Sequence, residues 1–203
     1  MAMHAGAVPA RGHAQVGMTR DMAGMVLFIA SEIMLFGGLF AGYFYLRNQA
    51  TTWPPEGIEH ELSWQVAALL SVILISSSLT AHAGMIGIIK NNRSLFKTGI
   101  AFSIILGTLF IGGQIYEWLT LMDEGLTAGS GSYGATFYVI TGFHGSHVIA
   151  GLLMLGVVLL RALWNDFTPG RHRFAEAAVL YWHFVDVIWV FVFFTLYVSP
   201  HLS

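Results

Sequence analysis

Long apolar stretches alternate with short polar segments along most of the chain. Five stretches are long enough to cross about 30 Å of hydrocarbon as a helix, which takes about 20 largely apolar residues. They lie at about residues 22–47, 64–89, 98–122, 133–163 and 177–198. The period-two alternation of a membrane β-barrel is absent, and lipid offers no hydrogen bonds to an open backbone. The pattern therefore predicts an all-α polytopic membrane protein, a bundle of five transmembrane helices.

The composition favours a protein that lies in lipid. Hydrophobic residues make up 56% of the chain and charged residues 10%, and the mean hydropathy is +0.68. A net charge of −2 does not suggest the basic face that nucleic-acid binding needs, and the lack of cysteine removes disulfides and thiolate metal sites. Residues 1–21 lack the apolar core of a signal peptide, so we expect a flexible cytoplasmic tail there and a single transmembrane domain over 22–203.

The positions of lysine and arginine predict the orientation of the bundle, because basic loops remain on the cytoplasmic side. Most basic residues fall in the amino-terminal tail, the second loop and the fourth loop: Arg11, Arg20, Lys90, Arg93, Lys97, Arg161, Arg171 and Arg173. Only Arg47 falls on the opposite side. We therefore expect the amino terminus to be cytoplasmic and the carboxyl terminus, residues 199–203, to lie outside.

Several ionisable residues fall inside the predicted spans, where a charged side chain at the centre costs about 2.5–3.5 kcal/mol on insertion scales. They are Glu32, His82, Glu117, His144, His147, His183 and Asp186. A rise of about 1.5 Å per residue places Glu32 near mid-membrane. The same count places His144, His147, His183 and Asp186 in the inner half, Glu117 near the outer surface, and His82 near the inner surface.

The spacing of these residues suggests two polar units. His144 and His147 are three residues apart, as are His183 and Asp186, so each pair lies on one helix face. One interpretation is proton handling or the binding of a polar ligand, and the other is hydrogen bonding that fixes helix packing. For Glu32, beside which we expect only Ser31 as a polar group, the functional interpretation is favoured.

Small and aromatic residues predict packing and interface positions. Glycines inside the spans should allow close helix contacts, and these are Gly38, Gly42, Gly107, Gly112, Gly113, Gly142, Gly145, Gly151 and Gly156. Trp53 lies near a predicted span end, where amphipathic rings favour the interface, whereas Trp182 lies inside the last span. We expect both tryptophans to contact lipid or another subunit.

Five segments occur in the order found in the cytochrome c oxidase subunit III family, which the chain resembles. They are Ser31–Phe36, Trp53–Ile58, Gln114–Trp118, Thr141–Val148 with its His-Gly-x-His motif, and Tyr181–Val190. The last segment, with Tyr181, Trp182, His183 and Asp186, is the strongest match. One His-Gly-x-His motif is weak evidence, but the ordered set touches essentially every span.

The resemblance implies an accessory subunit without a catalytic centre or metal of its own. Haem and copper would lie in partner subunits of an oxidase that reduces oxygen to water and pumps protons. The expected partners are subunit I as the main contact, subunit II, other oxidase subunits and phospholipids, within a possible respiratory supercomplex. Glu32 aligns with the family's carbodiimide-reactive glutamate, and the family's other polar positions are matched by Glu117, His144, His147, His183 and Asp186. Such a subunit supports proton uptake and binds lipid.

The chain departs from the longer mitochondrial type, which has seven helices, by lacking the first two, so a lipid-filled cleft would need another subunit to complete it. Five-helix forms occur in bacterial cytochrome oxidases and in cytochrome o ubiquinol oxidase, so we expect a bacterial cytoplasmic membrane. Trp53-Pro54-Pro55 and a glutamate at Glu32 favour the cytochrome c type.

Three alternatives remain open. One is subunit III of the ubiquinol oxidase. A proton-coupled transporter is more remote, because broken helices and inverted repeats are not evident. A b-type cytochrome is disfavoured, because we expect His82 to lie too far in depth from His144 and His183 to pair across a haem.

Overall fold

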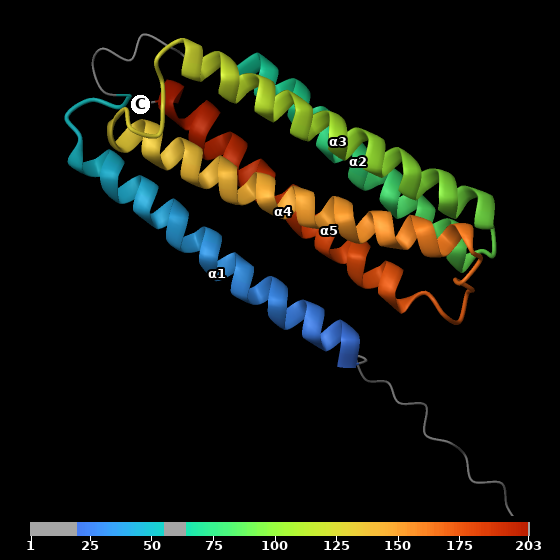
Figure 1. Ribbon diagram of the computed structural model, residues 1–203. Helices are drawn as coiled ribbons and strands as arrows, with labels where there is room; N and C mark the ends of the chain where they lie inside the picture. Colours follow the sequence, from blue (N-terminus) through green and yellow to red (C-terminus); the bar gives the residue numbers. More distant parts are fainter. Residues whose placement is uncertain (1–19, 55–63, 203) are drawn as a thin grey trace, which may run out of the picture.

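The computed structural model describes residues 20–54 and 64–202 (Figure 1). Its helices are α1 (Arg20–Gln49), α2 (Trp64–Ile89), α3 (Arg93–Asp123), α4 (Gly131–Leu163) and α5 (Arg173–Phe193), and α5 continues through a π-helical turn (Phe194–Val198) and a 3-10 turn (Ser199–Leu202). All five helices are long and apolar enough to cross a membrane. No strand occurs in the described ranges, so the prediction of an all-α bundle of five spans is confirmed.

The observed helix boundaries agree best with the predicted span boundaries where polar residues directly follow the apolar run. The bounds of α2 coincide with the predicted span. By contrast, α3 begins at Arg93 rather than at 98, because the side chain of Asn92 accepts a hydrogen bond from the Leu95 N–H and caps the helix. The start of α5 at Arg173 likewise precedes the predicted 177. Hydropathy marks the stretch that crosses hydrocarbon, whereas helical hydrogen bonds continue into the polar interface.

The helices form a bundle of four with a fifth on its side. Helices α2 and α3 pair as a hairpin, α3 contacts α4, α4 contacts α5, and α5 closes the bundle against α2. Helix α1 lies along one side, where it contacts chiefly α4 and α5 (Figure 1). Buried residues make up 61% of the most apolar window of α5 but 6% of that of α1. Helix α5 is therefore the core element, and α1 is peripheral.

The indole of Trp182 on α5 fills the centre of the bundle between two glycines. A Cβ added at Gly107 or at Gly151 would lie 2.6 Å from an atom of this ring, closer than real Cβ atoms approach. The Trp182 side chain is 0% exposed, and its Nε1–H donates a hydrogen bond of 3.0 Å to Ser77 Oγ on α2. Trp189 repeats the arrangement, with its Nε1–H donating to Ser71 Oγ at 2.8 Å. Helices α2 and α5 are thus joined by indole–serine hydrogen bonds.

The prediction that glycines mark close helix contacts is confirmed for Gly107, Gly113 and Gly151. For Gly142 the nearest atom belongs to Trp118 at 3.5 Å, which is an ordinary contact. The prediction is wrong within this chain for the glycines that have open space where a Cβ would lie: Gly38, Gly42, Gly112, Gly145 and Gly156. These glycines lie on the outward sides of their helices, where no neighbouring helix of the described chain approaches.

The connection between α4 and α5 is held by an arginine. Arg161 Nε donates a hydrogen bond of 2.8 Å to Asp166 Oδ2, and Arg171 Nη2 lies 3.7 Å from Asp166 Oδ1. The Arg161 guanidinium also lies over the rings of Phe167 and Phe174, at 5.0 and 5.4 Å from their centroids. The hydrogen bond from Arg161 lowers the pKa of the Asp166 carboxyl below its usual value, and the two guanidinium charges add to this effect.

Candidate functional site

Glu32 and His147 form a polar pair that joins α1 to α4. Glu32 Oε2 lies 2.8 Å from His147 Nε2, and the side chains are 17% and 13% exposed. Ser31, the neighbour expected beside Glu32, donates its hydroxyl to the Phe28 carbonyl instead. The expectation that Glu32 has only Ser31 near it is therefore wrong, because its partner comes from a helix that is distant in sequence.

The second nitrogen of His147 determines what the pair can do. His147 Nδ1 lies 2.7 Å from the carbonyl oxygen of Phe143. Since a carbonyl only accepts, Nδ1 carries a hydrogen. Nε2 then either accepts a hydrogen bond from the protonated carboxyl of Glu32 or, as part of an imidazolium, donates a hydrogen bond to the Glu32 carboxylate. The pair can hold one proton at either end with the same heavy-atom geometry.

His144 does not act as a unit with His147. Its ring is 1% exposed and lies among Trp189, Phe110 and Phe36, with ring centroids 5.1, 5.9 and 6.5 Å away. Neither ring nitrogen has a hydrogen-bond partner among the described residues. The spacing of three residues places both histidines near Phe36 of α1, but only His147 forms a hydrogen bond to that helix.

A second polar group lies between α2 and α5. His183 Nδ1 shares a hydrogen bond of 2.7 Å with Ser78 Oγ, and the His183 ring centroid is 6.2 Å from that of His82. His82 therefore lies closer to His183 than the expected difference in depth suggests, and the expectation that the two do not pair across a haem stays a prediction. Asp186, one turn along α5, is 7% exposed, and neither carboxylate oxygen has a hydrogen-bond partner in the described part of the chain. The predicted unit of His183 and Asp186 is thus replaced by His183 with Ser78 and His82.

Glu117 lies in a third, separate polar group near the other end of the bundle. Its Oε2 accepts hydrogen bonds from the Tyr197 hydroxyl at 2.8 Å and from Gln114 Nε2 at 3.0 Å. Tyr197 is 0% exposed and belongs to the π-helical turn that follows α5. Glu117 therefore ties the end of α5 to α3.

The two singled-out tryptophans have different surroundings. Trp182 is fully buried inside the chain, so the prediction that it contacts lipid or another subunit is wrong. Trp53 is half-buried, donates its Nε1–H to the Tyr43 hydroxyl at 3.0 Å, and contacts the ring of Tyr133. Part of its surface stays open, and an outside contact of Trp53 remains a prediction.

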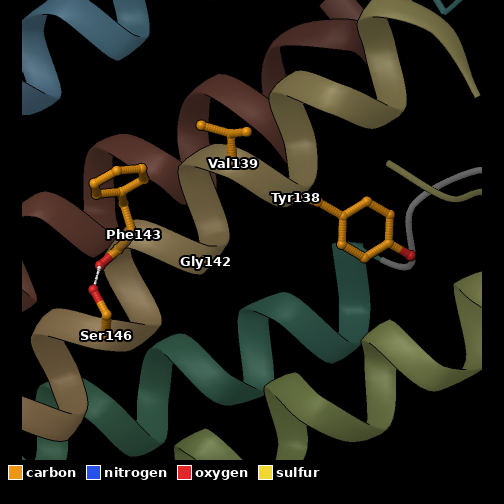
Figure 2. A pocket seen from close by; sticks show the side chains of 5 residues that line it. All are labelled: Tyr138, Val139, Gly142, Phe143 and Ser146. Atoms are coloured by element: carbon orange, nitrogen blue, oxygen red, sulfur yellow. Dashed lines mark hydrogen bonds between the residues drawn. The ribbon is translucent and has the colours of Figure 1, made fainter. Parts of the chain in front are cut away.

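A shallow groove follows the outer side of α4. Its volume is about 370 Å³, and its lining residues are Tyr138, Val139, Gly142, Phe143 and Ser146 (Figure 2). The hydroxyl of Ser146 donates to the Phe143 carbonyl at 2.6 Å, as the dashed line in Figure 2 marks, so it does not add a free polar group. The groove therefore has a mostly apolar lining.

Sequence reasoning missed the partners that the polar groups use. Ser71, Ser77 and Ser78 bind Trp189, Trp182 and His183. The signal was the run Ser76–Ser78 inside an otherwise apolar stretch, since hydroxyls in membrane helices commonly bond across to neighbours. Tyr197 had no such signal. In the described residues, no group of three or more His, Asp or Glu side chains could hold a metal ion.

Comparison with known proteins identifies the relatives of the chain. Residues 7–200 match the family model described as Cytochrome c oxidase subunit III. "Probable cytochrome c oxidase subunit 3" of Nocardia farcinica is 38% identical over 175 residues, which cover 86% of this chain and 85% of the relative. "Cytochrome c oxidase subunit 3" of Corynebacterium diphtheriae is 40% identical over 177 residues, with shares of 86% and 85%. The Drosophila melanogaster protein of that name is 38% identical over 179 residues, 86% of this chain but 67% of the relative.

Proposed function

The chain belongs to the cytochrome c oxidase subunit III family, and we propose that it is an accessory, non-catalytic subunit that stabilises subunit I. As subunit III of a haem-copper oxidase it is part of an oxidoreductase complex and a multi-pass membrane protein. Its partners include other oxidase subunits. Subunit I is the proposed main contact, and subunit II, further subunits and a respiratory supercomplex are additional proposed partners.

The observation that carries this proposal is that most intramembrane polar groups are bonded within the chain. Glu32 bonds to His147, His183 to Ser78, and Glu117 to Tyr197. Side chains committed to each other in this way fix helix packing and hold protons, whereas a redox centre needs ligands directed at a metal. This supports haem and copper in partner subunits, where oxygen reduction and proton pumping take place, with no cofactor in this chain.

The pair of Glu32 and His147 is the proposed element for proton support. A carboxyl and an imidazole 2.8 Å apart can exchange one proton without moving a helix. Glu117, His144, His183 and Asp186 are proposed as further positions that shape the proton or lipid environment. His144 is enclosed by aromatic rings, so its role in this proposal is the more structural one.

We also propose that a structural phospholipid binds this subunit. The groove on α4 offers about 370 Å³ with a mostly apolar lining, a shape that suits an acyl chain. The chain covers 85% of the relatives from Nocardia farcinica and Corynebacterium diphtheriae but 67% of the Drosophila melanogaster relative, and this supports a bacterial cytoplasmic membrane. In that membrane, the basic second and fourth loops favour a cytoplasmic amino terminus. We propose residues 1–21 as a tail and 22–203 as the membrane domain; residues 1–19, 55–63 and 203 lie outside the described part of the chain.

Carbodiimide labelling of the purified oxidase tests the role of Glu32. A protonated carboxyl within the membrane reacts with dicyclohexylcarbodiimide, so wild-type subunit III should be labelled and Glu32→Gln should not. The haem spectrum of the complex should be the same in both, because Glu32 is bonded to His147 of this chain. Glu176, a carboxyl at the start of α5, is the control, and Glu176→Gln should keep the label. Loss of haem from the Glu32→Gln complex would contradict an accessory role.

A further inference from the structure

An imidazole faces outward from the bundle at membrane depth. His82 is exposed on α2, and no hydrogen bond joins it to any other described residue, although its ring contacts that of His183. It lies seven residues before the end of α2 at Ile89, about 10 Å along the helix. Since α2 has 26 residues and is about 9 Å longer than the hydrocarbon layer, a centred helix places His82 roughly 6 Å inside it.

The surroundings of His82 are apolar. The outward surfaces of α2 and α5 around it, which we call the histidine face, consist of exposed Leu79, Ile86, Val187, Val190 and Phe194 together with His82 and half-buried His183. Acyl chains cannot form hydrogen bonds with an imidazole at this depth, so contact with lipid alone leaves its nitrogens unsatisfied. An apolar surface with a polar centre is what transmembrane helices use when they associate.

The other outward ionisable pair makes the contrast clear. Glu32 and His147 are also partly exposed, but they satisfy each other at 2.8 Å. His183 uses Nδ1 for Ser78, while its Nε2 makes no hydrogen bond with the described residues. Among the exposed histidine and carboxyl side chains inside the described spans, the unmet hydrogen-bonding capacity therefore lies at His82 and His183.

We propose that the histidine face is the surface with which this chain binds a transmembrane helix of another oxidase subunit, and that this helix places a hydrogen-bonding side chain against His82 and His183. The inference rests on the proposed function, because it assumes that the chain is held within the oxidase. It adds the location of the contact and the chemistry of the partner. The partner helix needs a polar side chain in the inner half of the membrane and an apolar surface around it.

Site-directed crosslinking in the intact oxidase tests this location. The chain has no cysteine, so a single introduced cysteine can carry a benzophenone without background labelling of this subunit. Leu79→Cys and Val187→Cys place the probe on the histidine face, where the native side chains are 67% and 54% exposed. Leu153→Cys is the control matched to Leu79→Cys. Leu153 on α4 is 68% exposed, and it lies ten residues from the inner end of its helix, as Leu79 does on α2.

The proposal predicts protein adducts to another oxidase subunit from Leu79→Cys and Val187→Cys, and chiefly lipid adducts from Leu153→Cys. Lipid adducts from the histidine face would overturn it, as would subunit adducts from Leu153→Cys alone. In either case the chain would still be recovered with the oxidase, so the proposed function would stand. Failure of the unmodified chain to purify with oxidase subunits would instead remove both proposals.

Substitution of His82 tests the proposed hydrogen bond to the partner helix. His82→Leu removes the polar group and leaves an apolar surface, whereas His82→Gln keeps a donor and an acceptor. In a detergent titration of the purified oxidase, His82→Leu should reduce retention of subunit III relative to subunit I by about threefold, a typical effect of one interhelical hydrogen bond in a membrane. His82→Gln should restore at least half of the retention. Equal retention of wild type and His82→Leu would overturn the proposed hydrogen bond.

Discussion

Replacing Gly151 by alanine should overfill the centre of the bundle. The new Cβ would lie 2.6 and 2.9 Å from two atoms of the Trp182 ring. The ring has little room to retreat. A Cβ built on Gly107 of α3 would also lie 2.6 Å from the ring, at another edge, and the ring's Nε1–H donates to Ser77 Oγ, with Nε1 and Oγ 3.0 Å apart. The substitution therefore has to shift a helix or break the Trp182–Ser77 hydrogen bond.

Three contributions set the expected destabilisation by Gly151→Ala. Overpacking a well-filled core costs about 1–3 kcal/mol, and loss of one interhelical hydrogen bond in a membrane costs about 0.6 kcal/mol. The higher helix propensity of alanine returns up to about 1 kcal/mol. We expect Gly151→Ala to destabilise the chain by about 1–3 kcal/mol, measured as a lower temperature of aggregation of the tagged subunit in native membranes.

Two comparisons show whether Trp182 is the cause. Gly156→Ala lies on the same helix with open space around it, so its aggregation temperature should equal that of the wild type. Trp182→Leu frees space beside Gly151, so adding Gly151→Ala to it should cost less than in the wild-type background. Equal effects of Gly151→Ala and Gly156→Ala, or the same cost in both backgrounds, would refute the packing argument.

Three other predictions concern the loop, the outer polar group and the groove. Because the pKa of Asp166 is lowered, its ion pair with Arg161 stabilises the fourth loop at pH values above the unfolded-state pKa of about 3.9, and this stabilisation is lost as the pH falls through the lower folded-state pKa. In limited proteolysis, the loop of Asp166→Asn should be cut at neutral pH, with little further change in acid. Equal cutting of the wild-type loop at neutral pH would contradict this prediction. Tyr197→Phe removes a hydrogen bond of 2.8 Å to buried Glu117 and should destabilise the subunit by about 1–3 kcal/mol. Tyr45→Phe, on the exposed side of α1, should have no effect. An equal aggregation temperature for the two variants would contradict a stabilising role of the Tyr197–Glu117 hydrogen bond. Gly142→Leu should fill the groove on α4 and lower the amount of bound phospholipid that mass spectrometry detects in the purified oxidase. Gly145→Leu, in open space, should leave this amount unchanged. A normal phospholipid content in Gly142→Leu would exclude the groove as the lipid site.

Local signals in the sequence were sufficient for the helices themselves. The run of apolar residues from Trp64 to Ile89 is bounded by polar residues at both ends, so hydropathy found the bounds of α2. Asn92 as a cap and the polar first turn of α5 lie outside hydrocarbon, and for this reason hydropathy placed both starts too late. A hydropathy count measures solvent preference, whereas a helix boundary depends on backbone hydrogen bonds.

Partners of the polar groups depend on which helices lie side by side, and spacing along one helix does not contain that information. Glu32 meets His147 only because α1 packs on α4. His82 lies near His183 although the two differ in depth, because side chains of adjacent helices extend well away from their helix axes. His82 and His183 lie about 10 and 15 Å along their helices from the inner ends, and two imidazole side chains of adjacent helices bridge that difference.

The outward glycines illustrate the same limit. The sequence alone does not distinguish Gly107, which faces Trp182, from Gly112, which has open space. Whether a glycine faces a neighbouring helix depends on how its own helix is rotated about its axis, and tertiary packing sets that rotation. Serine hydroxyls on α2 followed a detectable signal, whereas Tyr197 reaches Glu117 through a turn that no local pattern predicts.

Mild-detergent purification of the tagged chain from its native membrane tests the central claim most directly. Mass spectrometry of the copurified proteins and an optical spectrum should show a haem-copper subunit I, oxidase activity, and haem bound to that partner. Preference for cytochrome c over ubiquinol would separate the two oxidase types. Recovery of the chain alone and colourless, or haem bound to this chain itself, would contradict the assignment as an accessory oxidase subunit.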